Sequence, residues 1–312
     1  MTSCYNQFRF FPDLCLQQRR HMTYEVFKTH LIDTLTQELG ADVSLSVGDL
    51  SCPGISGTGQ DACVITIPDR RLSPVFYPGY FYQQFSEGTS LDEIVENIKD
   101  SIRYTSEDSL DFNEIADYNN AKNHIVPRLI RYEGHEVCLG KRAFIPYLDL
   151  AVIFTYVIKA EGDELVSFSI SDDQMDDWGI TVGTLYADSV RTAQRLFPPR
   201  IESIEDVLSL SNDSDMYHTF YVLSNSKRQY GAACLLYDHV MQDYAERIGE
   251  GFYVIPSSVH EVLLLPQSIG IGPSEMKEML DDVNASIVKP DEVLSDRVYH
   301  YDKSRQSLDF AV

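Results

Sequence analysis

The stretch Tyr253-Val-Ile-Pro-Ser-Ser-Val-His-Glu-Val-Leu-Leu-Leu-Pro266 sets a polar corner between two apolar runs. Residues 252–255 and 262–265 are short, apolar and bounded by prolines, which predicts two strands. Similar runs recur along the chain and alternate with helical patterns, such as 23–39 and 273–286. Hairpin-like strands mixed with helices favour an α+β fold, with mainly antiparallel sheets packed against helices.

The corner itself holds the candidate catalytic residues Ser257, Ser258, His260 and Glu261. A serine, a histidine and an acid can form a hydrolase triad when each touches the next. In an extended strand, however, Ser258 and His260 would lie about 6.5–7 Å apart, and Glu261 would point to the other face. The chain also lacks a G-x-S-x-G elbow. We therefore favour a structural corner, whose polar side chains satisfy backbone groups, over the hydrolase alternative.

A metal-dependent enzyme is a further alternative, because other histidines have acidic neighbours. These are His135 with Glu136, His239 with Asp238, and His260 with Glu261; His124 stands alone. No H-E-x-x-H motif or paired histidine spacing is present, so we expect no metal ligands. The glycine-rich segment 54–59 precedes a predicted strand, whereas phosphate binding needs a helix N-terminus. The sequence accordingly predicts no cofactor.

Charge and composition limit the partners. The 312 residues include 25 basic and 48 acidic side chains, a net charge of −23. Such a chain is repelled by phosphate backbones, which argues against nucleic acid and leaves a basic protein partner as an alternative. No apolar run reaches the roughly 20 residues that cross a bilayer. The six cysteines show no C-x-x-C pair, so the sequence predicts a cytoplasmic protein without disulfides.

The expected organisation is two closely associated subdomains. Residues 1–21 read as an extension or a mobile tail, because a helical pattern starts directly after Met22. An N-terminal α+β subdomain is expected over 22–199 and a C-terminal one over 217–312. The acidic, weakly apolar segment 200–216 is the predicted linker between them.

Several stretches carry a resemblance to a known family. They include Gly88-Thr-Ser-Leu-Asp-Glu-Ile94, Arg128-Leu-Ile-Arg-Tyr-Glu133, Leu148-Asp-Leu-Ala-Val-Ile-Phe154, Tyr230-Gly-Ala-Ala233, Ile255-Pro-Ser-Ser-Val-His-Glu-Val262 and Val293-Leu-Ser-Asp-Arg-Val-Tyr299. With them the chain resembles an uncharacterised family of gut Firmicutes proteins, a domain of unknown function. The resemblance implies a cytosolic bacterial protein. It implies no known activity and transfers no catalytic residue, so the leading hypothesis is a non-catalytic binding or regulatory protein.

Overall fold

The computed structural model describes residues 22–40, 43–48, 62–68, 74–104, 112–140, 142–161, 164–204, 220–289 and 292–311. The chain divides into two compact units, Met1–Ser51 with Gly59–Asp111 (unit 1) and Cys52–Thr58 with Phe112–Val312 (unit 2). Helices accompany antiparallel sheets in both units, which confirms the predicted α+β class. The expected tail 1–21 and the glycine-rich segment 54–59 lie outside the described residues.

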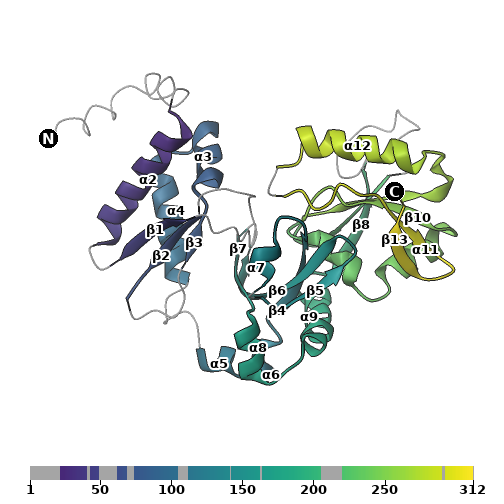
Figure 1. Cartoon of the computed structure of the whole chain (residues 1–312), viewed down its shortest axis with the longest axis horizontal. Coiled ribbons are helices and arrows are strands. Elements are labelled where there is room, and N and C mark those ends of the chain that lie inside the picture. Colours follow the sequence, from purple (N-terminus) through teal and green to yellow (C-terminus); the bar gives the residue numbers. More distant parts are fainter. Residues whose placement is uncertain are drawn as a thin grey trace. The chain divides into compact units, whose positions relative to one another are not determined.

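Unit 1 is a three-stranded antiparallel sheet with helices beside it (Figure 1). Its elements are α2 (Tyr24–Leu39), β1 (Ser44–Gly48), β2 (Ala62–Thr66), β3 (Val75–Phe76), α3 (Pro78–Glu87) and α4 (Leu91–Tyr104). Phe27, Leu31 and Leu35 recur every four residues on α2 and are buried in the core of this unit. Ser90 caps the start of α4, because the backbone N–H of Glu93 donates to the Ser90 hydroxyl.

The first sheet of unit 2 has β6 at its centre, with β4 on one side and β5 and β7 on the other. The elements of this part are α5 (Phe112–Ala116), α6 (Tyr118–Ala121), β4 (Ile125–Arg131), α7 (Glu136–Leu139), β5 (Phe144–Tyr147), β6 (Leu150–Glu161), β7 (Glu164–Ser169), α8 (Asp172–Trp178) and α9 (Val182–Leu196). Helix α9 packs against β4. Strands β5 and β6 form a tight hairpin, in which the chain turns at Leu148, where φ is 55°.

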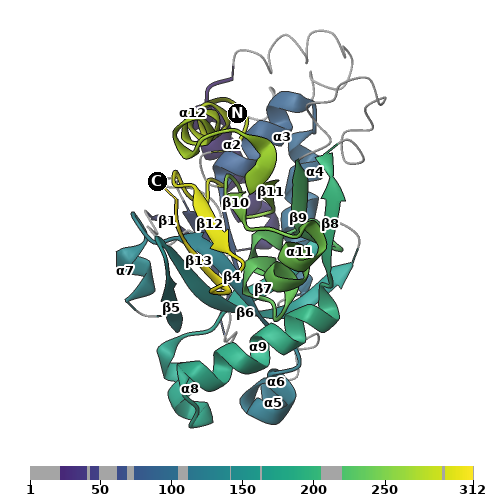
Figure 2. The ribbon, with the colours of Figure 1, turned by 90° about the vertical axis from the view of Figure 1, so that its right-hand side faces the viewer.

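The second sheet of unit 2 has six antiparallel strands in the order β13-β12-β10-β11-β9-β8 (Figure 2). Its elements are β8 (Pro199–Ser203), β9 (Tyr221–Asn225), η1 (Gly231–Leu236), α11 (Val240–Ile248), β10 (Phe252–Ile255), β11 (Val262–Pro266), η2 (Gln267–Ile269), α12 (Pro273–Ser286), β12 (Tyr299–Asp302) and β13 (Ser307–Phe310). The two runs that flank the polar corner are β10 and β11, paired antiparallel from Phe252 opposite Pro266 to Ile255 opposite Leu263.

Two helices cover opposite faces of this sheet, as the alternation of side chains along β10 requires. Ile255 packs in one cluster with Met276 and Leu280 of α12. Phe252, which points to the other face, meets Tyr244 of α11 with ring centres 4.8 Å apart. The strand pair on either side of the corner is therefore held in a fully packed layer.

The boundary observed at 111/112 differs from the predicted linker at 200–216, which falls inside unit 2. The first residues of that segment form β8, which pairs with β9 from Pro199 opposite Asn225 to Ser203 opposite Tyr221. An edge strand has only one partner and tolerates polar residues, which explains its linker-like composition. Residues 205–219 lie outside the described part of the chain. None of the described helices is both long and apolar enough to cross a membrane.

Candidate functional site

The corner, residues 256–261, is a joint between three segments of unit 2. Its backbone bonds are Val259 N–H to Glu292 O (2.9 Å), Leu294 N–H to Ser257 O (3.2 Å), Ser295 N–H to Pro256 O (3.1 Å) and Ala232 N–H to Val259 O (3.2 Å). The β10–β11 connection is thus fastened both to segment 292–295 and to η1. The backbone N–H and C=O groups of the corner are not paired between β10 and β11, so they need hydrogen-bond partners from other segments.

The two serines of the corner face different surroundings. Ser257 is buried. The Ser258 hydroxyl oxygen accepts the backbone N–H of His260 at 3.1 Å, a local bond that turns the chain toward β11. The corner thus brings Ser258 and His260 together through the main chain. Among the described residues, no hydroxyl is bonded to either nitrogen of the His260 ring.

Both nitrogens of the His260 ring have partners that come from distant parts of the chain. Nδ1 accepts the backbone N–H of Tyr230 at 3.2 Å, which places the proton of the neutral ring on Nε2. Nε2 lies 3.7 Å from the Glu292 carboxylate. The Tyr230 ring packs on the imidazole with ring centres 5.2 Å apart. His260 is therefore fixed between the loop that precedes η1 and the segment that precedes β12.

The carboxylate beside the histidine belongs to Glu292 and not to its sequence neighbour Glu261, which is partly buried. The interaction with the His260 ring lowers the pKa of Glu292, and the Lys289 ammonium at 3.4 Å acts in the same direction. Partial burial opposes this effect on the pKa. Sequence reasoning missed Glu292, because nothing in its local pattern indicates a partner so far along the chain.

Tyr230 and Arg128 are two further residues of the site that the catalytic hypothesis did not include. The Arg128 guanidinium carbon lies 3.8 Å from the centre of the Tyr230 ring, and Nη2 donates to the Ser167 hydroxyl at 2.7 Å. Tyr230 has a φ of 53°, a left-handed conformation that is uncommon for a non-glycine residue. Both residues begin stretches that carry the family resemblance, which is the only sequence signal for them.

The three other histidines named as metal-site candidates do not join this site. His135 is buried near Glu133, and burial lowers its pKa. His124 stacks on Tyr156, and His239 precedes α11. Within the described ranges, no three His, Cys, Asp or Glu side chains converge in a way that could hold a metal ion.

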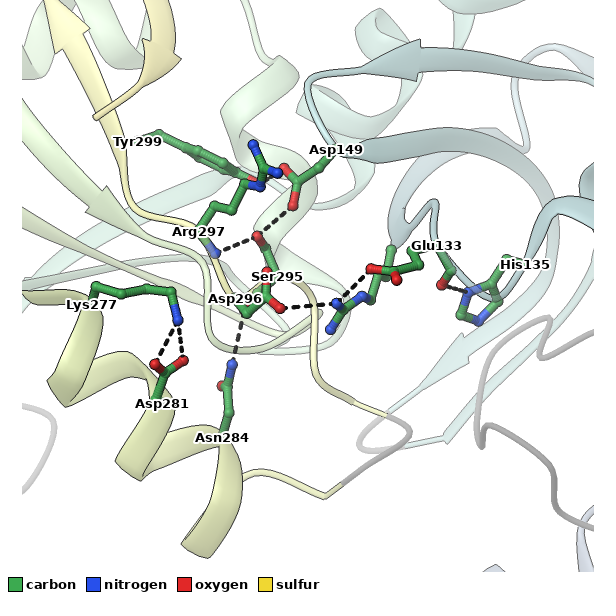
Figure 3. Close-up of polar contacts among 11 residues, drawn as sticks. Glu133, His135, Asp149, Lys277, Asp281, Asn284, Ser295, Asp296, Arg297 and Tyr299 are labelled. Carbon is green, nitrogen blue, oxygen red and sulfur yellow. Dashed lines mark hydrogen bonds and ion pairs between the residues drawn. The ribbon is translucent and has the colours of Figure 1, made fainter. Parts of the chain in front are cut away.

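A second polar cluster fastens the two sheets of unit 2 to each other (Figure 3). The Asp149 carboxylate, in the turn between β5 and β6, accepts the hydroxyls of Ser295 at 2.6 Å and Tyr299 at 2.5 Å. Next to it, Arg131 of β4 pairs with Asp296 at 3.1 Å. Burial, and then the Asp149 charge, raise the pKa of Tyr299 well above its usual range. The Tyr299 hydroxyl therefore remains protonated and acts as a donor to Asp149.

Taken together, unit 2 is an α+β body in which a histidine corner ties distant loops together beside a buried arginine. The chain belongs to a family of unknown function (DUF5688), which it matches over residues 24–303. No curated protein matches it, and no solved structure does.

Proposed function

We propose that this protein is a non-catalytic binding or regulatory protein of the cytoplasm, and that the Ser-Ser-Val-His-Glu corner is a structural joint. The observation that carries the proposal is the bonding of His260. A general base needs a free ring nitrogen within hydrogen-bond reach of the nucleophile. Here Nδ1 accepts the Tyr230 amide, and Nε2 faces a carboxylate.

The alternative of a hydrolase or metal-dependent enzyme uses Ser257 or Ser258 with His260 and Glu261. It requires the Ser258 hydroxyl to leave the His260 amide and reach the imidazole ring. It also requires the ring to release the Tyr230 amide, which would then lie unpaired in a partly buried place. The binding proposal requires neither change.

A protein is the expected type of partner, and the net charge of −23 favours a basic one over nucleic acid. A reducing compartment accords with Cys63 and Cys234, which are both buried free thiols. An acidic mimic that captures a basic protein is the remaining alternative, and it predicts binding that weakens steeply as salt is added.

The test compares wild type with His260→Gln, which keeps an amide acceptor near the Tyr230 N–H but cannot act as a base. Both are assayed on ester, peptide and phosphoester substrates, with and without added Zn²⁺ or Mn²⁺. We expect no turnover that depends on His260. Turnover by wild type that disappears in a folded His260→Gln protein would refute the proposal. Glu261→Gln is the matched control, because the hydrolase alternative needs Glu261 and the structural joint does not.

A further inference from the structure

The rotation of helix α12 about its axis is fixed by one row of side chains that faces the body of unit 2. Met276 and Leu280 are both 0% exposed and pack in the core cluster beneath the helix. Asn284 continues this row, and its side-chain amide donates to Ser295 O at 2.9 Å (Figure 3). Because residues four apart on a helix share a face, these contacts determine which side of α12 points outward.

A second row on α12 is apolar and exposed. Met279, Val283 and Ile287 also lie four residues apart, rotated by about 60° from the inward row. Met279 is 36% and Ile287 76% exposed, and Val283 is partly buried. A single exposed apolar residue is ordinary on a protein surface. Three in a row form an apolar ridge about 12 Å long, and such a ridge is what a second helix packs against.

Carboxylates border the outward side of the apolar ridge. Glu275 lies four residues before Met279, Asp282 three residues after it, and Glu278 beside them; all three carboxylates are exposed. Within the part of the chain that the structure describes, none of the three forms an ion pair. The one basic residue of the helix, Lys277, pairs with Asp281 on the opposite flank (Figure 3). The flank with the apolar ridge is therefore negatively charged.

The charge decides which occupant suits the apolar ridge. A second copy of the chain would bring the same carboxylates against each other, and like charges across an interface repel. The net charge of −23 adds to that repulsion. A partner with lysine or arginine beside its own apolar residues would instead cover the ridge and face the carboxylates with opposite charge.

We propose that the apolar ridge of Met279, Val283 and Ile287 is the docking surface for an amphipathic basic helix of a partner protein. Rows of residues four apart on two helices interlock, which is the commonest way for helices to pack. Opposite charges beside the apolar contact speed association and select the partner. This inference rests on the proposed binding function and names its docking surface and the chemistry of its partner.

The test uses the full-length chain and two dye-labelled peptides, with binding measured by fluorescence anisotropy. The helical peptide has two repeats of Leu-Lys-Lys-Leu-Leu-Lys-Leu, which place leucines on one helix face and lysines on the other. The alternating peptide has two repeats of Leu-Lys-Leu-Lys-Leu-Lys-Leu, with the same composition and charge but the period of a strand. We expect the helical peptide to bind about tenfold more tightly, because only its leucines can cover the ridge as a helix.

Two apolar variants locate the binding. Met279→Ser combined with Ile287→Ser should weaken binding of the helical peptide about tenfold, because both changes remove apolar surface from the contact. Val26→Ser combined with Val75→Ser is the matched control, since these two residues are 46% and 44% exposed and lie outside α12. The control should bind the helical peptide as wild type does.

Two charge variants test the carboxylates. Changing Glu275 and Glu278 to Gln and Asp282 to Asn should weaken binding of the helical peptide and make it less sensitive to salt. The matched control changes three exposed carboxylates of α8, residues 173, 176 and 177, to Asn and alters the net charge equally. All the substituted side chains are exposed, so each variant should keep the urea midpoint of wild type. If Met279→Ser with Ile287→Ser fails to fold, the charge variants decide.

Three results would overturn the inference. They are equal affinity for the two peptides, unchanged binding by the Met279→Ser and Ile287→Ser protein, and an equal loss of affinity in the α8 and α12 charge variants. A dimer in sedimentation that these apolar substitutions dissociate would also overturn it, because the ridge would then contact a second copy. None of these results bears on catalysis. Turnover that depends on His260 would refute the proposed function even where the helical peptide binds to α12.

Discussion

Replacing Gly231 by alanine is the sharpest test of how tightly the corner is packed. A Cβ built at this position would come within 2.5 Å of His260 O and 2.7 Å of the Asn225 backbone nitrogen, and would also overlap the Ser224 hydroxyl. Contacts below 3.0 Å force a shift of the neighbouring atoms. Here two of the three neighbours are main-chain atoms of β9 and of the corner, and neither can move alone.

The cost can be worked out from two contributions. Forcing a methyl group into a well-packed site typically costs about 1–3 kcal/mol. The bond from the Ser224 hydroxyl to His260 O, 2.8 Å long, would also be broken or distorted, at about 1 kcal/mol. We therefore expect Gly231→Ala to lower the free energy of unfolding of unit 2 by roughly 2–4 kcal/mol. That is a large share of the about 5–15 kcal/mol that stabilises a typical domain.

Urea unfolding followed by tryptophan fluorescence measures this change. Trp178 is the only tryptophan of the chain, and its indole N–H donates to Ile115 O at 3.0 Å within unit 2. Gly183→Ala is the control, because its new Cβ would meet nothing closer than Thr181 at 3.8 Å and alanine favours the helix. If Gly231→Ala shifts the midpoint no more than Gly183→Ala does, the close packing of the corner described above is wrong.

Three further predictions concern other parts of the chain. Because His260 lowers the pKa of Glu292, the stabilisation from this carboxylate is present above its ordinary value of 4.5 and is lost as the pH falls through the lowered folded value. Glu292→Gln should therefore reduce the fall of the urea midpoint below about pH 4.5; an unchanged pH profile would contradict this. Tyr299→Phe removes a donor to Asp149 and should cost roughly 1.5–3 kcal/mol in the same urea assay. Burial raises the thiol pKa to about 11 for Cys63 and about 12 for Cys234, so iodoacetamide at pH 8 should label both only after unfolding, as read by peptide mass spectrometry.

Matched variants make these results specific. Glu261→Gln should leave the acid profile as it is in wild type, because no His260 contact is lost. Ser307→Ala, on the edge strand β13, is the control for Tyr299→Phe and should hardly change the urea midpoint. If Tyr299→Phe shifts the midpoint as little as Ser307→Ala does, the hydrogen bond from Tyr299 to Asp149 adds nothing to stability. Rapid labelling of Cys63 or Cys234 in native buffer would show that the thiol is accessible without unfolding.

The sequence predicts the local elements of the fold well where the hydrophobic pattern is strong. Strands β10 and β11 and helix α12 lie where apolar periodicity placed them. Helices η1 and α11 are separate, because the backbone leaves the helical conformation between them and is left-handed at His239, where φ is 66°. Strand β13 is not evident from the sequence, since Ser307 and Asp309 are polar and none of its residues is buried, as on many edge strands.

The site could be predicted only in part, for a physical reason. The bond from Ser258 to the His260 amide is local, and a Ser-Ser-Val-His turn suggests bonding of that kind. The partners of the imidazole lie on other segments, and their approach depends on how β9, η1 and segment 292–295 pack around the corner. The hydrophobic pattern of β4 likewise cannot show whether Arg128 is buried or exposed, because the residues before and after it in the sequence are apolar.

The contacts that link the corner to Tyr230 and Arg128 give the polar residues of the corner a physical role. A left-handed backbone at Tyr230 costs roughly 1–2 kcal/mol in a residue with a side chain, so something must hold it there. The bond to His260 Nδ1 and the contact with the Arg128 guanidinium are the interactions that do so. The next residue is Gly231, where the Cβ atom of any other residue would clash with the backbone oxygen of His260 in the corner. The stretches 230–233 and 255–262 therefore pack against each other, and together they hold the Tyr230 ring against the buried Arg128 guanidinium.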